Sequence, residues 1–183
     1  MKLVRDSALA LAAAALPLAA PASAKNPMVG GAAMYPTKTI VQNAVNSKDH
    51  TTLVAAVKAA GLVDTLNGKG PFTVFAPTNA AFNRLPARTV DTLVKPENKG
   101  TLTKILTYHV VPGRITAGAL AAKIKQGGGS ASLTTVEGGK LTARMMGKEV
   151  VLTDAKGGKS TVTTANVMQS NGVIHVVDHV LMP

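Results

Sequence analysis

The chain has 183 residues, a formal charge of +11 at neutral pH and no cysteine. A chain of this length suits one domain, large enough to bury a stable core without disulfides. The lack of cysteine excludes disulfides, thiolate metal sites and a thiol nucleophile. Aromatic residues make up 3% of the chain and tryptophan is absent, which argues against a nucleic-acid-binding protein. The basic charge fits attraction to anionic polysaccharide or acidic proteins, or it serves solubility alone.

The first 24 residues have the pattern of an export signal. Lys2 and Arg5 give a positively charged start, residues 8–20 form an apolar stretch, and Ala22-Ser23-Ala24 is a small-x-small cleavage site. The apolar stretch is shorter than the roughly 20 residues that span a bilayer. We therefore expect residues 1–24 to be a cleaved signal peptide, with a buried N-terminal helix as the alternative. The product is expected to be secreted or periplasmic and not to span a membrane.

The next part of the chain changes from an irregular composition to helical spacing. Residues 25–37 are rich in glycine, alanine and proline without periodicity, which predicts a flexible leader before a domain at 38–183. Apolar residues at helical spacing then predict two short helices, over residues 40–45 and 51–60. Gly61 stands where a glycine often ends a helix.

The remaining sequence alternates strands and helices and then becomes rich in strands. The first group comprises a strand at 72–76, a short helix at 80–85 capped by Pro77-Thr78-Asn79, a helix from Pro96, a strand at 108–111 and a helix at 116–125. After the glycines at 127–129, hairpin spacing predicts strands at 133–136, 141–145, 150–153, 161–164 and 173–177. A helical first half and a β-rich second half predict one α+β domain with mostly antiparallel strands.

Three stretches of this region resemble the conserved boxes of the fasciclin domain family. They are Gly70–Phe82, Tyr108–Val111 and Ser170–Pro183. The stretches occur in the family's order, and the resemblance extends from Thr39 to Pro183. Within them, Thr73 and Asn79 are expected to hydrogen-bond turn backbone, and Gly172 after Asn171 to form a tight turn before the last strand.

The resemblance implies both a fold and a function. The fold is expected to be a wedge of two small, mostly antiparallel β-sheets with helices packed along one side. The function is expected to be that of a secreted, non-catalytic interaction module, which mediates cell adhesion or contacts with the cell envelope or extracellular matrix. The expected partner is a protein or an anionic polysaccharide and not a nucleic acid. The chain itself is expected to be a monomer or a weak oligomer.

Four residues are candidates for partner binding. Tyr108 and His109 match the tyrosine–histidine motif through which some animal relatives bind integrins. Residues 166–169 lack the acidic Asp-Ile element that accompanies that activity, so integrin binding itself is not carried over. The surface around Asp178 and His179 is the second candidate. The same resemblance predicts that His109 is a buried, hydrogen-bonded histidine rather than a catalyst.

The segment His175-Val176-Val177-Asp178-His179 has the spacing of a zinc-peptidase motif, H-x-x-E-H. That motif needs a helix, whereas in the predicted strand its two histidines stand about 13 Å apart. The catalytic position holds aspartate instead of glutamate, and neither a third ligand nor a serine-nucleophile or phosphate-loop motif is evident. We therefore expect no enzyme activity, no metal and no cofactor. Asp178 and His179 should form a surface hydrogen-bonded pair or end the strand.

An alternative function is that of a periplasmic or extracellular carrier of a small apolar ligand. Some fasciclin-like proteins hold such molecules, including carotenoids, and methionine side chains adapt well to irregular ligands. The candidate lining residues are Met145, Met146, Met168 and Met182. Methionines that fill ordinary core and surface positions are the competing interpretation, and five phenylalanines and tyrosines in total provide little aromatic surface for a polyene.

Overall fold

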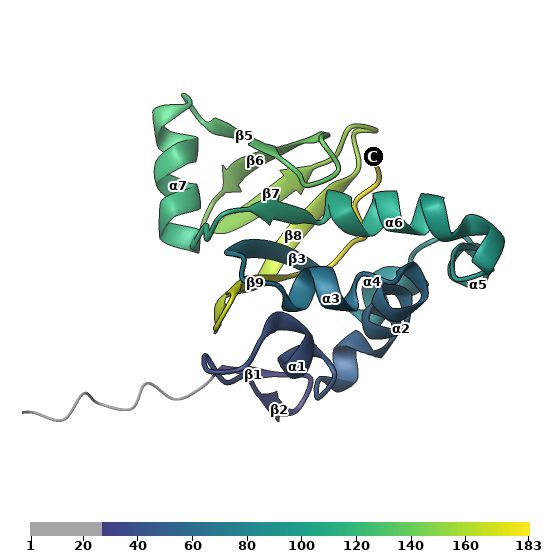
Figure 1. Ribbon diagram of the computed structural model, residues 1–183. Coiled ribbons are helices and arrows are strands. Elements are labelled where there is room, and N and C mark those ends of the chain that lie inside the picture. Colours follow the sequence, from purple (N-terminus) through teal and green to yellow (C-terminus); the bar gives the residue numbers. More distant parts are fainter. Residues whose placement is uncertain (1–26) are drawn as a thin grey trace, which may run out of the picture.

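The structure, a computed structural model, describes residues 27–183 (Figure 1). The expected signal peptide and its cleavage site after Ala24 lie outside the described residues. The helices are α1 (Ile40–Ala44), η1 (Lys48–His50), α2 (Thr51–Ala60), α3 (Val63–Asn67), α4 (Asn79–Asn83), α5 (Thr89–Leu93), η2 (Pro96–Asn98), α6 (Lys99–Tyr108) and α7 (Ala117–Gln126). The strands are β1 (Met28–Val29), β2 (Ala32–Ala33), β3 (Phe72–Pro77), β4 (Val110–Pro112), β5 (Ser130–Thr134), β6 (Lys140–Met146), β7 (Glu149–Thr153), β8 (Lys159–Gln169) and β9 (Gly172–Val177).

Seven strands form one continuous sheet in the order β4-β3-β9-β8-β7-β6-β5, in which every neighbouring pair is antiparallel except β3 and β9. The 11-residue strand β8 pairs with β7 at its start and with β9 after it, and register shifts bend it between the two. The sheet curls until its ends meet, where the amide of Val136 donates to the carbonyl of Val110 at 2.8 Å. The expectation of two small sheets is therefore wrong, because one long bulged strand joins them. The α+β class is confirmed.

Alternate residues of the central strands serve two hydrophobic cores, one on each face of the sheet. Val74 in β3 and its partner Ile174 in β9 pack with the helices α1, α2, α4 and α6. Phe75 and Val177 point the other way, into a core enclosed by the curled sheet and closed by Leu120 of α7. Figure 1 shows α2, α3, α4 and α6 gathered on one side of β3 and β9, with α7 beside β5 and β6.

Polar residues of the first box fix the helix ends, as the sequence predicts. The Thr78 hydroxyl accepts from the Ala81 amide and caps α4. The Asn79 side chain accepts from the Thr52 amide in the first turn of α2. Gly61 adopts the left-handed conformation, with φ of 71°, at the end of α2. These contacts lock α2 and α4 onto the end of β3.

Two parts of the predicted pattern differ from the structure. The strand expected at 108–111 begins at Val110, because Tyr108 still belongs to α6 and His109 ends that helix. Residues 27–37, expected to belong to a flexible leader, contain the hairpin of β1 and β2. Met34, directly after this hairpin, is buried in the helical core. No helix within residues 27–183 has the length and apolar character needed to cross a membrane.

Candidate functional site: an arginine–aspartate–histidine cluster

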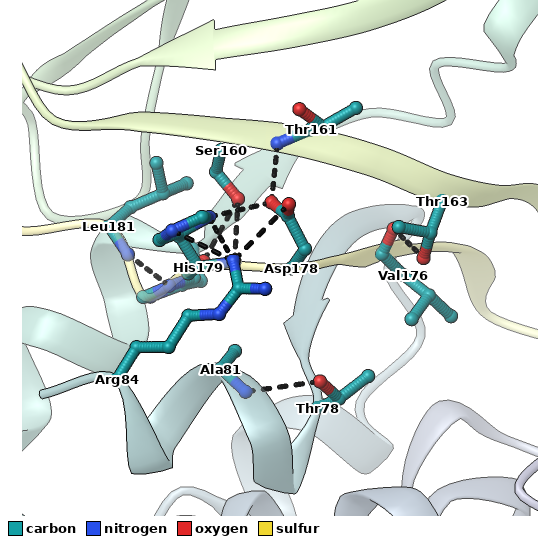
Figure 2. A network of polar contacts seen from close by, with 11 residues as sticks. Thr78, Ala81, Arg84, Ser160, Thr161, Thr163, Val176, Asp178, His179 and Leu181 are labelled. Carbon is teal, nitrogen blue, oxygen red and sulfur yellow. Dashed lines mark hydrogen bonds and ion pairs between the residues drawn. The ribbon is translucent and has the colours of Figure 1, made fainter.

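Three charged or titratable side chains meet where β9 ends (Figure 2). Asp178 and His179 follow Val177, the last residue of β9, and Arg84 directly follows α4. His179 Nδ1 lies 2.8 Å from Asp178 Oδ1, and Arg84 Nη1 lies 3.5 Å from Asp178 Oδ2. The structure thus confirms that Asp178 and His179 form a hydrogen-bonded pair beyond the strand. It adds Arg84, which no sequence motif marked.

The neighbouring strand β8 holds the backbone of this cluster in place. The Thr161 amide donates to Asp178 Oδ1 at 2.7 Å, and the Asp178 amide donates to the Thr161 carbonyl at 3.2 Å. The Ser160 hydroxyl donates to the His179 carbonyl at 2.9 Å and accepts from the His179 amide at 3.1 Å. Asp178 and His179 are therefore positioned by four hydrogen bonds to β8, although they lie outside a regular strand.

The surroundings of Asp178 favour its ionised form. Partial burial by itself would raise the pKa of Asp178. The hydrogen bonds from His179 and from the Thr161 amide, with the charges of His179 and Arg84, outweigh burial and hold that pKa below its ordinary value. An ionised carboxylate can only accept hydrogen bonds. Nδ1 of His179 therefore carries a proton and donates a hydrogen bond to Asp178.

A terminal nitrogen of Arg84 lies close to the imidazole ring of His179. This nitrogen, Nη1, lies 3.1 Å from Nδ1 and 2.9 Å from Nε2 of the ring. An atom this close to both nitrogens cannot lie in the ring plane, because Cε1 stands between them. Nη1 therefore lies over the ring face.

The cluster remains open to solvent despite these contacts. The exposed fractions of the Arg84, His179 and Asp178 side chains are 54%, 44% and 29%. A partner can therefore reach the outer N–H groups of the guanidinium and the Nε2 edge of the ring. The guanidinium is suited to a carboxylate or another acceptor on a partner, since Arg84 can offer a two-pronged donor.

The zinc-peptidase interpretation fails because His175 and His179 do not face one site. His175 is buried in β9, where its Nε2 contacts the Ile115 carbonyl at 2.7 Å and its Nδ1 accepts from the Asn166 amide at 3.3 Å. Both ring nitrogens are thus occupied by backbone groups. The described part of the chain contains no group of three or more histidine and acidic side chains that could hold a metal ion.

Tyr108 and His109 lie in the interior, with exposed fractions of 0% and 2%. The Tyr108 hydroxyl donates to the Lys140 carbonyl at 2.7 Å and accepts from the Ala155 amide at 3.0 Å. It thereby joins the end of α6 to the β5–β6 and β7–β8 hairpins. Neither side chain presents a surface to a partner in this conformation, and burial is the physical reason.

His109 joins the end of α6 to the C-terminal segment. Its Nδ1 contacts the Ile105 carbonyl at 2.8 Å, and its Nε2 accepts from the Leu181 amide at 2.9 Å. Desolvation by burial lowers the pKa of His109 to about 4, against a smaller opposing effect of the hydrogen bond to Ile105. The structure therefore agrees with the predicted buried, hydrogen-bonded histidine.

An apolar cavity of about 50 Å³ lies between the helices and the sheet. It is lined by residues of α1, α2, α3, β3, α6 and β4, among them Val57, Leu66 and Leu106. Lys58 is the one lining residue that carries a formal charge, and Val136, which is 42% exposed, stands at its edge. The four candidate methionines do not line this cavity. Met145 and Met146 lie instead at the exposed end of β6.

Comparison with known proteins assigns this architecture to a family. The fasciclin domain model matches residues 48–183. Protein sll1483 of Synechocystis is 49% identical over 159 residues, covering 87% of this chain and 81% of that protein. The cell surface glycolipoprotein MPB83 of Mycobacterium bovis is 35% identical over 170 residues, covering 88% and 68%.

A solved structure shows the same fold at low sequence identity. It is a FAS1 domain pair from the insect cell adhesion molecule fasciclin I, with a TM-score of 0.68 and 22% identity. The match covers 80% of this chain and 51% of the other, so the chain spans about half of that domain pair. On the family match and the sequence identities together, the chain belongs to the fasciclin domain family.

Proposed function

We propose that this chain is an exported, non-catalytic interaction module that makes contacts at a cell surface, in the cell envelope or in the matrix. The observation that carries the proposal is the cluster of Arg84, Asp178 and His179, which is exposed yet fixed by β8. A preorganised charged site of this kind loses little conformational entropy when a partner binds. Two similar proteins, one a cell surface glycolipoprotein and the other a domain pair from a cell adhesion molecule, support the same setting.

A non-catalytic role agrees with the way in which the buried histidines are used. In His109 and in His175, both ring nitrogens are hydrogen-bonded to backbone groups. Neither histidine can therefore act as a base without breaking one of these contacts. His179 is bound to a carboxylate but has no nucleophile among its hydrogen-bonded neighbours other than Ser160, whose hydroxyl is engaged with the His179 backbone. The cluster has a fixed conformation and carries charge, and neither property requires a catalytic role.

The test is saturable binding of labelled protein to intact cells and to isolated envelope and matrix fractions of the producing organism. Arg84→Ala and His179→Ala are each expected to weaken that binding at least about tenfold, as for residues central to an interface. Lys104→Ala removes one exposed positive charge from α6 and serves as the matched control. Unchanged binding by both cluster variants would move the recognition site elsewhere, and no saturable binding by the wild type would sink the proposed function.

The apolar cavity favours a second candidate function, the binding of a small apolar ligand. Its lining is mostly aliphatic, with two phenylalanines, Phe72 and Phe75, and such a site gains affinity by removing apolar ligand surface from water. Native mass spectrometry of protein isolated from its own exported fraction is the direct test. A stoichiometric extra mass that disappears in Ala44→Leu, which fills the cavity, would establish the carrier. Ala55→Leu adds the same side chain at an exposed position of α2 and should retain the ligand.

A further inference from the structure

The outer face of the curled sheet carries a regular set of hydroxyl and cationic side chains. Directly paired residues of neighbouring strands point to the same side of a sheet. The strand registers of β5 to β8 therefore place on one face Ser130, Ser132, Thr134, Lys140, Thr142, Arg144, Met146, Glu149, Val151, Thr153, Lys159 and Thr161. Of these twelve residues, all except Val151 are exposed or half-exposed. The face is thus polar, open and dominated by hydroxyl groups.

The opposite face of the same strands is the buried one. Leu133, Leu141 and Leu152 point into the enclosed core, and α7 packs there through Leu120 and Ile124. On the outer side, eleven of the twelve residues are exposed or half-exposed, so no element of the described region covers them. The outer face is therefore free to meet another molecule.

Three cations on this face have no acidic partner. Lys140, Arg144 and Lys159 take part in none of the ion pairs found within residues 27–183. Lys148 and Lys156 add two exposed positive charges in the adjoining hairpin turns, β6–β7 and β7–β8. The face consequently keeps its positive charge available for a ligand.

The nearby acidic residues offset little of that charge. Glu149 is the one acid on the outer face itself. Glu137 turns back to accept from the Gly139 amide at 3.0 Å. Asp154 is buried and accepts from the amides of Lys156, Gly158 and Met182. Asp178 accepts from the amide of Thr161, a residue of the outer face, and contacts His179 and Arg84. Three of the four acids near the face are therefore committed to contacts within the protein.

The spacing of the cations suits a polymer with repeated negative charges. Lys140 and Arg144 are four residues apart on β6, or about 14 Å, and Lys159 lies two strands away, about 12 Å from each. Between the three lie the paired hydroxyl residues Thr142 and Thr153. Cations this far apart meet separate anionic groups, and the hydroxyls between them can bond to neutral parts of the same ligand.

We propose that the outer face of β5–β8 binds an anionic polysaccharide, whose acidic groups contact Lys140, Arg144 and Lys159 while its sugar hydroxyls contact Thr142 and Thr153. A nucleic acid fits less well, because the face has no aromatic side chain on which a base could stack. A membrane fits less well, because Met146 and the 7%-exposed Val151 are its only apolar members. This inference rests on the proposed export of the chain, but not on the Arg84–Asp178–His179 cluster.

The experiment measures binding of the purified protein to dextran sulfate, to polygalacturonate and to uncharged dextran by isothermal titration calorimetry. Lys140→Glu, Arg144→Glu and Lys159→Glu combined should weaken binding of both acidic polymers at least about tenfold, since each contact is an exposed charge pair. The matched control combines Lys48→Glu, Lys69→Glu and Lys104→Glu, which change the net charge equally at exposed positions elsewhere. Equal losses in the two triple variants would show attraction by net charge alone and overturn the site.

A second pair of variants separates polysaccharide recognition from general polyanion binding. Thr142→Val and Thr153→Val keep the shape, the charge and the strand propensity but remove the central hydroxyls. They should weaken polygalacturonate binding severalfold while leaving binding of polyphosphate unchanged. Equal binding of polyphosphate, single-stranded DNA and polygalacturonate by the wild type, or tight binding of uncharged dextran, would refute the proposal. If the triple Glu variant does not show a cooperative melt, Lys140→Gln, Arg144→Gln and Lys159→Gln replace it.

Failure of the sheet-face site can be distinguished from failure of the proposed function. His179→Ala should leave polysaccharide affinity unchanged, because His179 is not on the outer face of β5–β8. Loss of cell binding in His179→Ala with intact polysaccharide binding supports two separate surfaces. Intact cell binding with no measurable affinity for either acidic polymer refutes the sheet-face site and leaves the interaction module standing.

Discussion

The amide of Leu181 donates to Nε2 of His109 at 2.9 Å, across 72 positions of sequence. Since a backbone N–H can only donate, Nε2 must be unprotonated, and the proton of the neutral ring lies on Nδ1, where it is donated to the Ile105 carbonyl. A second proton on Nε2 would place two donors against each other in a buried site. His175 repeats this arrangement with the ring reversed, since its Nδ1 accepts from Asn166 and its Nε2 donates to Ile115.

The first prediction is that the protein loses stability as the pH falls from about 6.5 to about 4. The pKa of His109 in the folded chain is lowered to about 4, so in this range the unfolded histidine binds a proton and the folded one does not. The free energy of unfolding therefore decreases with falling pH, by about 3 kcal/mol from His109 alone. Burial also lowers the pKa values of His50 and His175, which adds to the loss. Urea denaturation at a series of pH values measures this decrease in the free energy of unfolding.

His109→Gln tests the assignment, because glutamine can donate to Ile105 and accept from Leu181 without titrating. The variant should show a smaller decrease in unfolding free energy between pH 6.5 and 4 than the wild type. Above pH 7 the two proteins should differ by a constant offset, which serves as an internal control. Parallel curves over the whole range would assign the acid sensitivity to other groups.

The second prediction concerns the buried hydroxyl of Tyr108. Tyr108→Phe removes the donor to Lys140 and the acceptor for Ala155, leaving a backbone carbonyl and a backbone amide without that partner. We expect a loss of about 1–3 kcal/mol in the free energy of unfolding, with partner binding unchanged. Tyr35→Phe at a 43%-exposed position is the matched control and should change stability by less than about 0.5 kcal/mol. Weakened partner binding in a folded Tyr108→Phe protein would return this residue to the recognition site.

The third prediction follows from the contacts of Asp178. His179→Ala removes a hydrogen bond and a charge that lower the pKa of Asp178, so that pKa should rise. Arg84→Ala should raise it less, because the Nη1–Oδ2 separation is 3.5 Å and the pair is largely solvated. Carboxyl carbon NMR titration reports the pKa directly, with Arg88→Ala as a control for loss of a nearby exposed cation. A larger rise in Arg84→Ala than in His179→Ala would contradict the geometry.

The fourth prediction concerns Gly172, at the start of β9. A side chain here would collide with the Phe72 carbonyl oxygen, which belongs to the parallel neighbour β3. Gly172→Ala should therefore cost more than about 2 kcal/mol of unfolding free energy, because backbone on both central strands must move. Gly100→Ala, in α6 with open space around it, should instead stabilise the protein by up to about 1 kcal/mol. Chemical denaturation of the two variants gives the comparison.

Local patterns predicted the elements whose cause is local. The strand at 72–76, the cap formed by Thr78 and the glycine that ends α2 all depend on a few neighbouring residues, and each was found in place. Ser170 and Asn171 form a tight turn into β9, as the Asn171-Gly172 pair predicts, and the structure adds the close approach of Gly172 to the paired strand β3. Glycine is needed at this position, and part of the reason is the paired strand β3, which is distant in the sequence.

The remaining features depend on long-range pairing. Arg84 meets Asp178 because the parallel pairing of β3 and β9 brings the ends of both strands together, and no motif near Arg84 signals this. The single sheet arises from register shifts within β8, which alternation of polar and apolar residues does not reveal. Met34 is buried although its two-residue flanking strands are too short to show a period.

The central position of β9 has a consequence for the order of synthesis and folding. β9 lies between β3 and β8, so the halves of the sheet cannot join until residues 172–177 have been made. A nascent chain that ends between β8 and β9 exposes one edge of β3 and one edge of β8, and long-range strand pairing is slow to form. The two halves of the sheet can therefore join only near the end of synthesis, so the fold is completed late, when almost the whole chain has been made.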